Sequence, residues 1–122
     1  MRKFLAIAAC VLTAFLLPAQ TNQSKNAGAP PGNADNGKKL FANDGCYQCH
    51  GREGQGGEGT GPHLGPHPIP FAQFERYVRA PTGQMPPYTA KVVSAQDLAD
   101  IYAFLSSRPQ PPAAKSLPQL RN

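Results

Sequence analysis

The sequence predicts a small all-α domain built from three main helices. Two segments repeat apolar residues at intervals of three or four, and a shorter one follows cap-type residues. No segment alternates apolar and polar residues as a half-buried strand does. Fourteen prolines and twelve glycines among 122 residues leave room for short helices only. A domain of this size buries a modest core, so we expect a further group to help stabilise it.

The N-terminus has the order of a secretory signal. Two basic residues precede an apolar run over residues 4–17, and a short segment ending in Ala-Gln follows. The run is shorter than the roughly 20 residues that span a bilayer, so we interpret residues 1–20 as a cleaved signal peptide. The protein is then exported, to the periplasm or the outer face of the cytoplasmic membrane. Cys10 follows Ile-Ala-Ala, which resembles a lipidation site, so a lipidated or uncleaved N-terminus is the alternative.

Charge excludes a nucleic-acid partner. The formal net charge of +5 falls to +3 when the two basic residues of the signal are removed. The other basic residues are scattered, with no basic run and no interleaved aromatic residues. A mildly basic face for an acidic redox partner and an ordinary solvated surface both fit this pattern.

A flexible linker is expected over residues 21–32, because its small and polar residues offer nothing to bury. The first helix is expected over residues 37–42, after cap-type residues at 33–35. Phe41 belongs to its apolar side, and Gly37 lies one turn earlier. Glycine inside a helix costs about 1 kcal/mol relative to alanine, so we expect another element to approach Gly37 closely.

The segment after this helix carries the strongest chemical signal. Cys46-Tyr47-Gln48-Cys49-His50 reads C-x-x-C-H, the pattern by which haem is attached covalently. Two thiols at this spacing can reach two vinyl groups on one edge of a porphyrin, while the adjacent imidazole reaches the iron. We therefore predict one haem c, covalently bound through Cys46 and Cys49, with His50 as an iron ligand.

Three other interpretations of these cysteines are weaker. They are the only cysteines outside the expected signal, so they could form a disulfide in an oxidising compartment. A zinc site would need a second pair of ligands, which the sequence lacks. A thioredoxin-like redox pair should follow a strand, and none is predicted.

Glycine dominates residues 51–65, where no phosphate-binding pattern occurs. We expect this backbone to wrap closely around a large flat object.

A second helix opens at Ile69-Pro70 and stops before Pro81. Its expected apolar face is Phe71, Phe74, Tyr77 and Val78.

Ser94 is the expected cap of a third helix, with Asp97 in the first turn. The apolar positions of this helix are Leu98, Ile101, Tyr102, Phe104 and Leu105. Residues 108–122 are proline-rich and without periodicity, so we expect a disordered tail. The folded domain is then residues 33–107.

Met85 is the expected second iron ligand, because it is the sole methionine outside the signal and lies in a loop stiffened by two prolines. A thioether is a soft ligand that suits haem iron and raises its potential relative to a second histidine. His63 and His67 are rival candidates. Both follow His50 closely in sequence, so we expect them on its side of the ring, at the surface or near the propionates.

Residues 33–107 resemble class I c-type cytochromes, the small electron carriers with one haem. The matching features are Gly37 and Phe41, the C-x-x-C-H motif, Gly61-Pro62-x-Leu64, Met85-Pro86 and the closing segment 100–105. The resemblance implies the cytochrome c fold, with its first and last helices packed across each other around the haem. It also implies that the carbonyl of Pro62 accepts a hydrogen bond from His50, which would orient the ring and raise its basicity.

This ligand set points to outer-sphere transfer of one electron rather than to catalysis, since His50 and Met85 leave no open position at the iron. Phe71 and Tyr88 should exclude water from the site. We expect a monomeric carrier between redox partners in the periplasm or at the membrane. A dedicated cytochrome subunit of a larger dehydrogenase or oxidase is the alternative. A haem peroxidase or gas sensor would require Met85 to dissociate.

Overall fold

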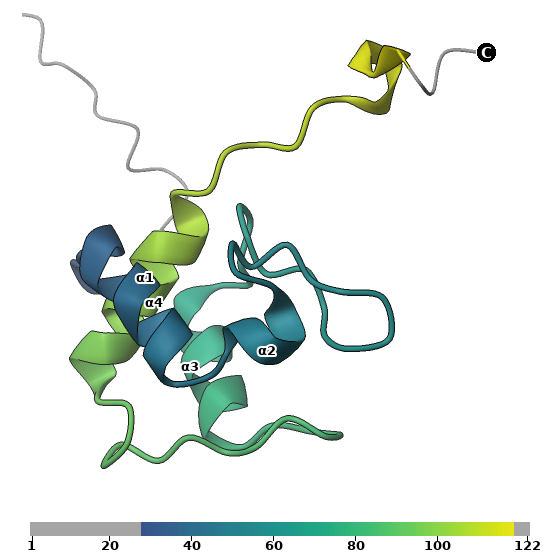
Figure 1. Ribbon diagram of the computed structural model, residues 1–122. Helices are drawn as coiled ribbons and strands as arrows, with labels where there is room; N and C mark the ends of the chain where they lie inside the picture. The colour runs from purple at the N-terminus through teal and green to yellow at the C-terminus, as the bar shows by residue number, and fades with distance from the viewer. Residues whose placement is uncertain (1–27, 119–122) are drawn as a thin grey trace, which may run out of the picture.

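The computed structural model describes residues 28–118, and in this range it contains four α-helices and one 3-10 turn (Figure 1). The elements are α1 (Ala34–Asn43), α2 (Tyr47–His50), α3 (Phe71–Arg79), α4 (Ala95–Ser106) and η1 (Ala114–Ser116). These residues contain no strand and only one isolated bridge, between Gly57 and Gly61. The predicted all-α class is confirmed.

Several expectations concern residues outside this range. The described residues do not include the expected signal peptide over residues 1–20, with the lipidation alternative at Cys10. They also leave out most of the expected linker and the last four residues of the expected tail. Among residues 28–118, no helix is long and apolar enough to cross a membrane.

The helix starts follow the predicted caps. The side chain of Asn33 accepts a hydrogen bond from the N–H of Asn36 at 3.0 Å, so α1 begins one turn before the predicted start. Ser94 and Asp97 form a reciprocal capping box at the start of α4, with N–H to oxygen distances of 3.1 and 2.9 Å.

The short helix α2 was not predicted. It is one turn inside the C-x-x-C-H motif, too short to show a helical apolar period. It ends at Gly51, whose φ of +74° suits glycine and whose N–H donates to the carbonyl of Tyr47 at 2.9 Å. This turn brings the histidine of the motif inward.

Helix α1 packs against α4 (Figure 1). Gly37 lies at the contact between the two helices. A Cβ at Gly37 would lie 1.9 Å from the carbonyl oxygen of Asp100 and 2.8 Å from the nitrogen of Ile101. No side chain fits at that distance, so the close neighbour expected of Gly37 is the backbone of α4. The implied packing of the first helix on the last is confirmed.

A buried carboxylate joins the same two helices. Asp100 is 5% exposed and accepts hydrogen bonds from the N–H of Asn33 at 2.8 Å, from Asn36 Nδ2 at 2.7 Å and from Gln96 Nε2 at 2.9 Å. Burial alone would raise the pKa of Asp100, but the three hydrogen bonds outweigh it and hold the pKa below its ordinary value.

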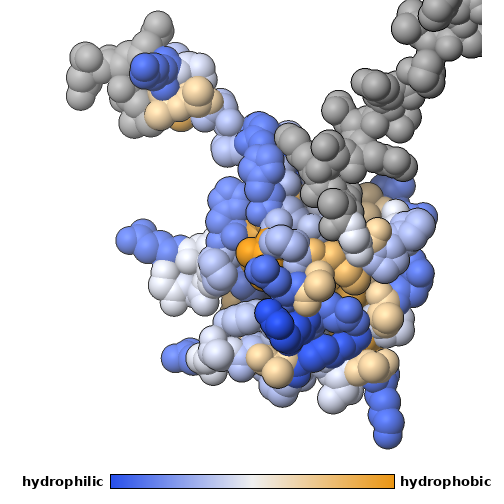
Figure 2. Space-filling view, turned by 180° about the vertical axis from the view of Figure 1, so that it is seen from behind, coloured by the Kyte–Doolittle hydropathy of each residue, from blue (hydrophilic) through white to orange (hydrophobic). Residues whose placement is uncertain are grey.

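The core lies between α1, α3 and α4. The predicted apolar positions of α4 are all buried, and the ring of Phe71 meets that of Tyr102 edge-on at 5.3 Å. On the face opposite to the view of Figure 1, apolar residues are visible at several places among hydrophilic ones (Figure 2). The buried core residues are Phe41, Phe71, Phe74, Val78, Val93, Leu98, Ala99, Ile101, Tyr102, Phe104 and Leu105.

Tyr77 departs from the predicted apolar face of α3. Phe71, Phe74 and Val78 are buried, but Tyr77 is 42% exposed. The three buried residues form a narrow stripe, and Tyr77 lies at its border, where its hydroxyl can stay in water. That hydroxyl lies 3.0 Å from Oγ1 of Thr82.

Residues flanking the predicted domain also pack on it. Ala29 packs against the core, and Gln96 Nε2 donates to the carbonyl of Pro31 at 3.1 Å, within the segment expected to be linker. Arg108, expected in the tail, donates through Nε to the carbonyl of Phe104 at 3.1 Å. Beyond it the chain leads away from the helices, and the turn η1 buries no residue (Figure 1).

Candidate haem site

His50 lies at the end of α2 and is 8% exposed. Its Nδ1 is 2.9 Å from the carbonyl oxygen of Pro62. Because a carbonyl can only accept, Nδ1 carries the proton and donates it, which leaves the lone pair on Nε2. This is the tautomer of a histidine that binds a metal through Nε2.

The glycine-rich loop folds back onto the motif. A Cβ at Gly61 would lie 2.7 Å from the carbonyl oxygen of Cys49 and 3.0 Å from Nδ1 of His50. Thr60 Oγ1 donates to the same Cys49 carbonyl at 2.9 Å. A Cβ at Gly56, Gly61 or Gly65 would meet backbone atoms of this chain most closely, and the expectation that the loop wraps a flat object stays a prediction. The absence of a side chain at residue 61 allows Pro62 to reach His50.

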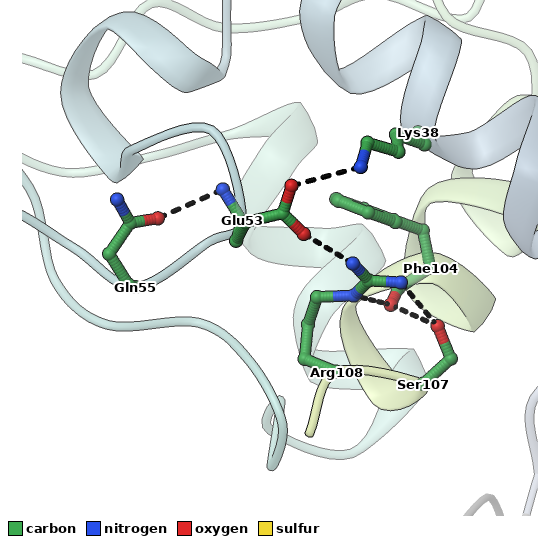
Figure 3. Close-up of polar contacts among 6 residues, drawn as sticks. All are labelled: Lys38, Glu53, Gln55, Phe104, Ser107 and Arg108. Atoms are coloured by element: carbon green, nitrogen blue, oxygen red, sulfur yellow. Dashed lines mark hydrogen bonds and ion pairs between the residues drawn. The ribbon is translucent and has the colours of Figure 1, made fainter. Parts of the chain in front are cut away.

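A polar network ties the start of this loop to α1 and to the end of α4 (Figure 3). Lys38 Nζ donates to one carboxylate oxygen of Glu53 at 2.9 Å, and Arg108 NH1 donates to the other. These hydrogen bonds lower the pKa of Glu53. The guanidinium of Arg108 also lies over the ring of Phe104, 4.1 Å from its centroid. This network leaves no local pattern in the sequence, because its three residues lie 15 and 55 positions apart along the chain.

Cys46 and Cys49 are both free thiols, so the disulfide alternative is not present in the structure. Cys46 is half-buried and Cys49 is exposed. Burial, followed by the charge of Asp44, raises the pKa of Cys46 to about 11, so this thiol is protonated at neutral pH. A thioether bond to a vinyl group forms from a reduced thiol, which is the state of both cysteines.

The zinc and thioredoxin-like alternatives lack support. No group of three or more His, Cys, Asp or Glu side chains that could hold a metal ion occurs in residues 28–118. A thioredoxin-like pair would follow a strand, and the described residues contain none.

Met85 lies in the loop between α3 and α4, half-buried and packed against the core. Tyr88, three residues later, donates its hydroxyl hydrogen to the carbonyl of Asp44 at 2.9 Å. This bond joins the Met85 loop to the segment directly before Cys46. Burial raises the pKa of Tyr88, so the hydroxyl keeps its proton for this bond at neutral pH.

The two rival histidines have partners at the surface. Both side chains are exposed, with Nε2 of His63 against the carbonyl of Gly65 and Nε2 of His67 against the side chain of Gln110. Neither histidine is part of the buried core.

The residues present fit a covalently attached haem. Two reduced thiols, a buried imidazole with a free Nε2 lone pair and a thioether at the core are the donors that such a group needs. Apolar side chains that are only partly buried pack against the core and could cover an apolar ring: Leu40, Tyr47, Leu64, Met85 and Tyr88. An all-α domain with these groups is of the c-type cytochrome class.

The family model described as cytochrome c oxidase, cbb3-type, subunit III matches residues 32–105. The chain belongs to this family. It is therefore a haem-based electron-transfer protein and not an enzyme, and its family implies covalently bound haem c. A search of curated proteins and a search of solved structures gave no significant match.

Proposed function

We propose that the protein transfers one electron at a time through a single haem c, which Cys46 and Cys49 bind covalently and His50 and Met85 ligate from opposite faces. Its donor and acceptor are redox proteins in the periplasm or at the outer face of the membrane. The observation that carries this proposal is the hydrogen bond from His50 Nδ1 to the carbonyl of Pro62 at 2.9 Å, because it leaves Nε2 for the iron.

The surroundings of His50 support its role as the proximal ligand. The hydrogen bond holds the ring in one orientation and increases the basicity of Nε2. The ring is nearly buried, so little water competes for the free lone pair. When bound, haem supplies the iron that takes up and returns the electron.

Met85 is favoured over the two rival histidines as the second ligand. It packs at the core, whereas His63 and His67 are exposed and engaged with other groups. With His50 and Met85 as ligands, the chain would leave no axial position for a substrate. Phe71 in the core and the half-buried Tyr88 would limit the access of water and so help to keep the potential positive.

The test compares wild-type protein with Met85→Ala, both made as full chains with a cytochrome c maturation system. We expect the wild type to show a covalent c-type spectrum and the charge-transfer band of a methionine ligand. Met85→Ala should lose that band, lower the potential and bind carbon monoxide when reduced. An unchanged band in the variant would contradict ligation by Met85. Strong binding of carbon monoxide by the wild type would instead favour a gas sensor or peroxidase.

A second candidate is a dedicated cytochrome subunit of a larger oxidase or dehydrogenase, which the family match favours. Fractionation of native cells without chemical crosslinking separates the two candidates. A free carrier should be recovered as a soluble monomer, and a subunit should migrate with its complex.

Export is a further part of the proposal. The intact mass of the mature protein should correspond to cleavage near Ala19 or Gln20, plus one haem. A mass that includes a lipid on Cys10, or the uncleaved residues 1–20, would contradict simple export and indicate membrane attachment.

A further inference from the structure

We infer that Arg79 is a positioning residue for Met85, because its guanidinium binds the segment that follows Met85 to the end of α3. The inference rests on the proposed ligation by Met85 and adds what keeps the weak thioether ligand in place.

Arg79 is the last residue of α3 and is half-buried. One of its nitrogens, NH1, donates to the carbonyl of Tyr88 at 2.9 Å and to that of Val93 at 2.7 Å. The N–H of Tyr88 donates in turn to the carbonyl of Val78 at 3.0 Å. Both ends of the segment 88–93 are therefore held to the last turn of α3.

Both partners of NH1 are carbonyl oxygens and not carboxylates, so Arg79 binds backbone here instead of forming an ion pair. Hydrogen bonds from a charged donor are stronger than those between neutral groups. NH1 carries two N–H groups in a fixed plane, one for each carbonyl. A neutral side chain cannot replace both bonds at the same strength.

The Met85 loop depends on such external bonds. Pro86 and Pro87 have no N–H to donate, so the backbone directly after Met85 cannot contribute hydrogen bonds of that kind. A second bond comes from the hydroxyl of Tyr88 to the carbonyl of Asp44 at 2.9 Å. Because a thioether binds iron weakly, the fraction of molecules with Met85 bound should depend on these contacts.

Carbon monoxide measures that fraction, because in the reduced protein it competes with Met85 for the iron. Its apparent affinity rises in proportion to the share of molecules in which Met85 is detached. For full-length, haem-loaded Arg79→Gln, we expect this affinity to rise on the order of tenfold. The methionine charge-transfer band of the oxidised protein should weaken in parallel.

Arg76→Gln is the matched control. Arg76 lies one turn earlier on α3, is exposed, and its replacement removes the same charge. Carbon monoxide affinity and band intensity should stay at wild-type values in this control. Arg79→Lys keeps the charge on a side chain that ends one bond short of NH1, so its affinity should lie between those of the wild type and Arg79→Gln.

Hydrogen exchange gives a readout on the chain itself. The amide of Tyr88 should exchange faster in Arg79→Gln than in Arg76→Gln, because the carbonyl of the same residue loses its donor. Tyr88→Phe removes the hydroxyl that bonds to the carbonyl of Asp44 and leaves both Arg79 bonds in place. It should also raise carbon monoxide affinity.

The outcomes separate this inference from the proposed function. A wild type without the charge-transfer band would refute ligation by Met85 itself. If the wild type shows the band but Arg79→Gln binds carbon monoxide with the same affinity as the Arg76→Gln control, the role of Arg79 is overturned and ligation by Met85 still stands. A shifted potential with unchanged affinity would mean that Arg79 acts through its charge, which also overturns it. If Arg79→Gln does not form a haem-loaded protein, Arg79→Lys provides the test. An Arg79→Lys variant that binds carbon monoxide with the affinity of the wild type would contradict the inference.

Discussion

Replacing Gly37 by alanine should force α1 and α4 apart. The added Cβ would lie 1.9 Å from the carbonyl oxygen of Asp100 and 2.4 Å from its carbon, both backbone atoms. Ordinary van der Waals contact begins at 3.4 Å, so the helices must separate by at least 3.4 minus 1.9, or about 1.5 Å. No side chain can rotate to relieve this clash.

The expected loss of stability follows from three terms. Overpacking of a rigid contact costs about 1–3 kcal/mol. The same shift stretches the hydrogen bond from Asn36 Nδ2 to Asp100, now 2.7 Å, and a hydrogen bond to a charged group contributes about 1.5–3 kcal/mol. The higher helix propensity of alanine offsets about 1 kcal/mol of this loss in the free energy of unfolding. The net loss is about 1.5–5 kcal/mol. At about 4–8 °C per kcal/mol for a domain of this size, the unfolding temperature falls by about 6–40 °C.

Thermal unfolding of the haem-loaded full chain, followed by far-ultraviolet circular dichroism, measures this loss. Lys39→Ala is the control, because it introduces alanine at an exposed position of the same helix and should change stability by less than about 0.5 kcal/mol. A Gly37→Ala variant that unfolds at or above the wild-type temperature would refute the close packing of α1 on α4.

Two further predictions concern buried and exposed carboxylates. Asp100→Asn places an amide among three hydrogen-bond donors and should lower the free energy of unfolding in guanidinium by about 2–4 kcal/mol. Because the pKa of Asp100 is lower in the folded protein, the stability that its carboxylate contributes is present above about pH 4 and is lost as the pH falls through the folded pKa. The difference in unfolding free energy between wild type and variant should therefore become smaller in acid. A difference that stays constant with pH would contradict this. Glu53→Gln should cost less than about 1 kcal/mol at physiological salt, since the Glu53 side chain is 47% exposed. The pKa of Glu53 is lower than the ordinary 4.5 in the folded protein, so that small difference should disappear as the pH falls through the folded value. A loss above about 2 kcal/mol in urea unfolding would show that the network with Lys38 and Arg108 contributes more than a surface ion pair.

The helices were predictable because their signals are local. Cap residues such as Asn33 and Ser94 act on backbone groups within three positions, and apolar spacing marks the buried side of α3 and α4. The same rule misplaced Tyr77, because periodicity cannot separate the edge of an apolar stripe from its centre. It also missed α2, which has a single turn.

For the candidate site, the residue types that could bind haem were predictable, and their roles stay a prediction. The C-x-x-C-H motif contains two thiols and an imidazole within five residues, and Met85 is the sole methionine outside the expected signal. The contact of Pro62 with His50 was implied by resemblance, and the structure contains it at 2.9 Å. The bonds of Arg79 left no mark in the sequence, because a basic residue at a helix end is usually solvated.

By itself, the sequence determined the all-α class, the caps of α1 and α4 and the thiol, imidazole and thioether groups, because each depends on residue type and on neighbours a few positions away. Only the tertiary structure decided that Gly37 meets the backbone of α4, that Asp100 is buried among donors up to 67 positions away, and that Arg79 binds the segment after Met85. The physical reason is that backbone carbonyls and buried charges find their partners through the packing of whole elements, which no local pattern encodes.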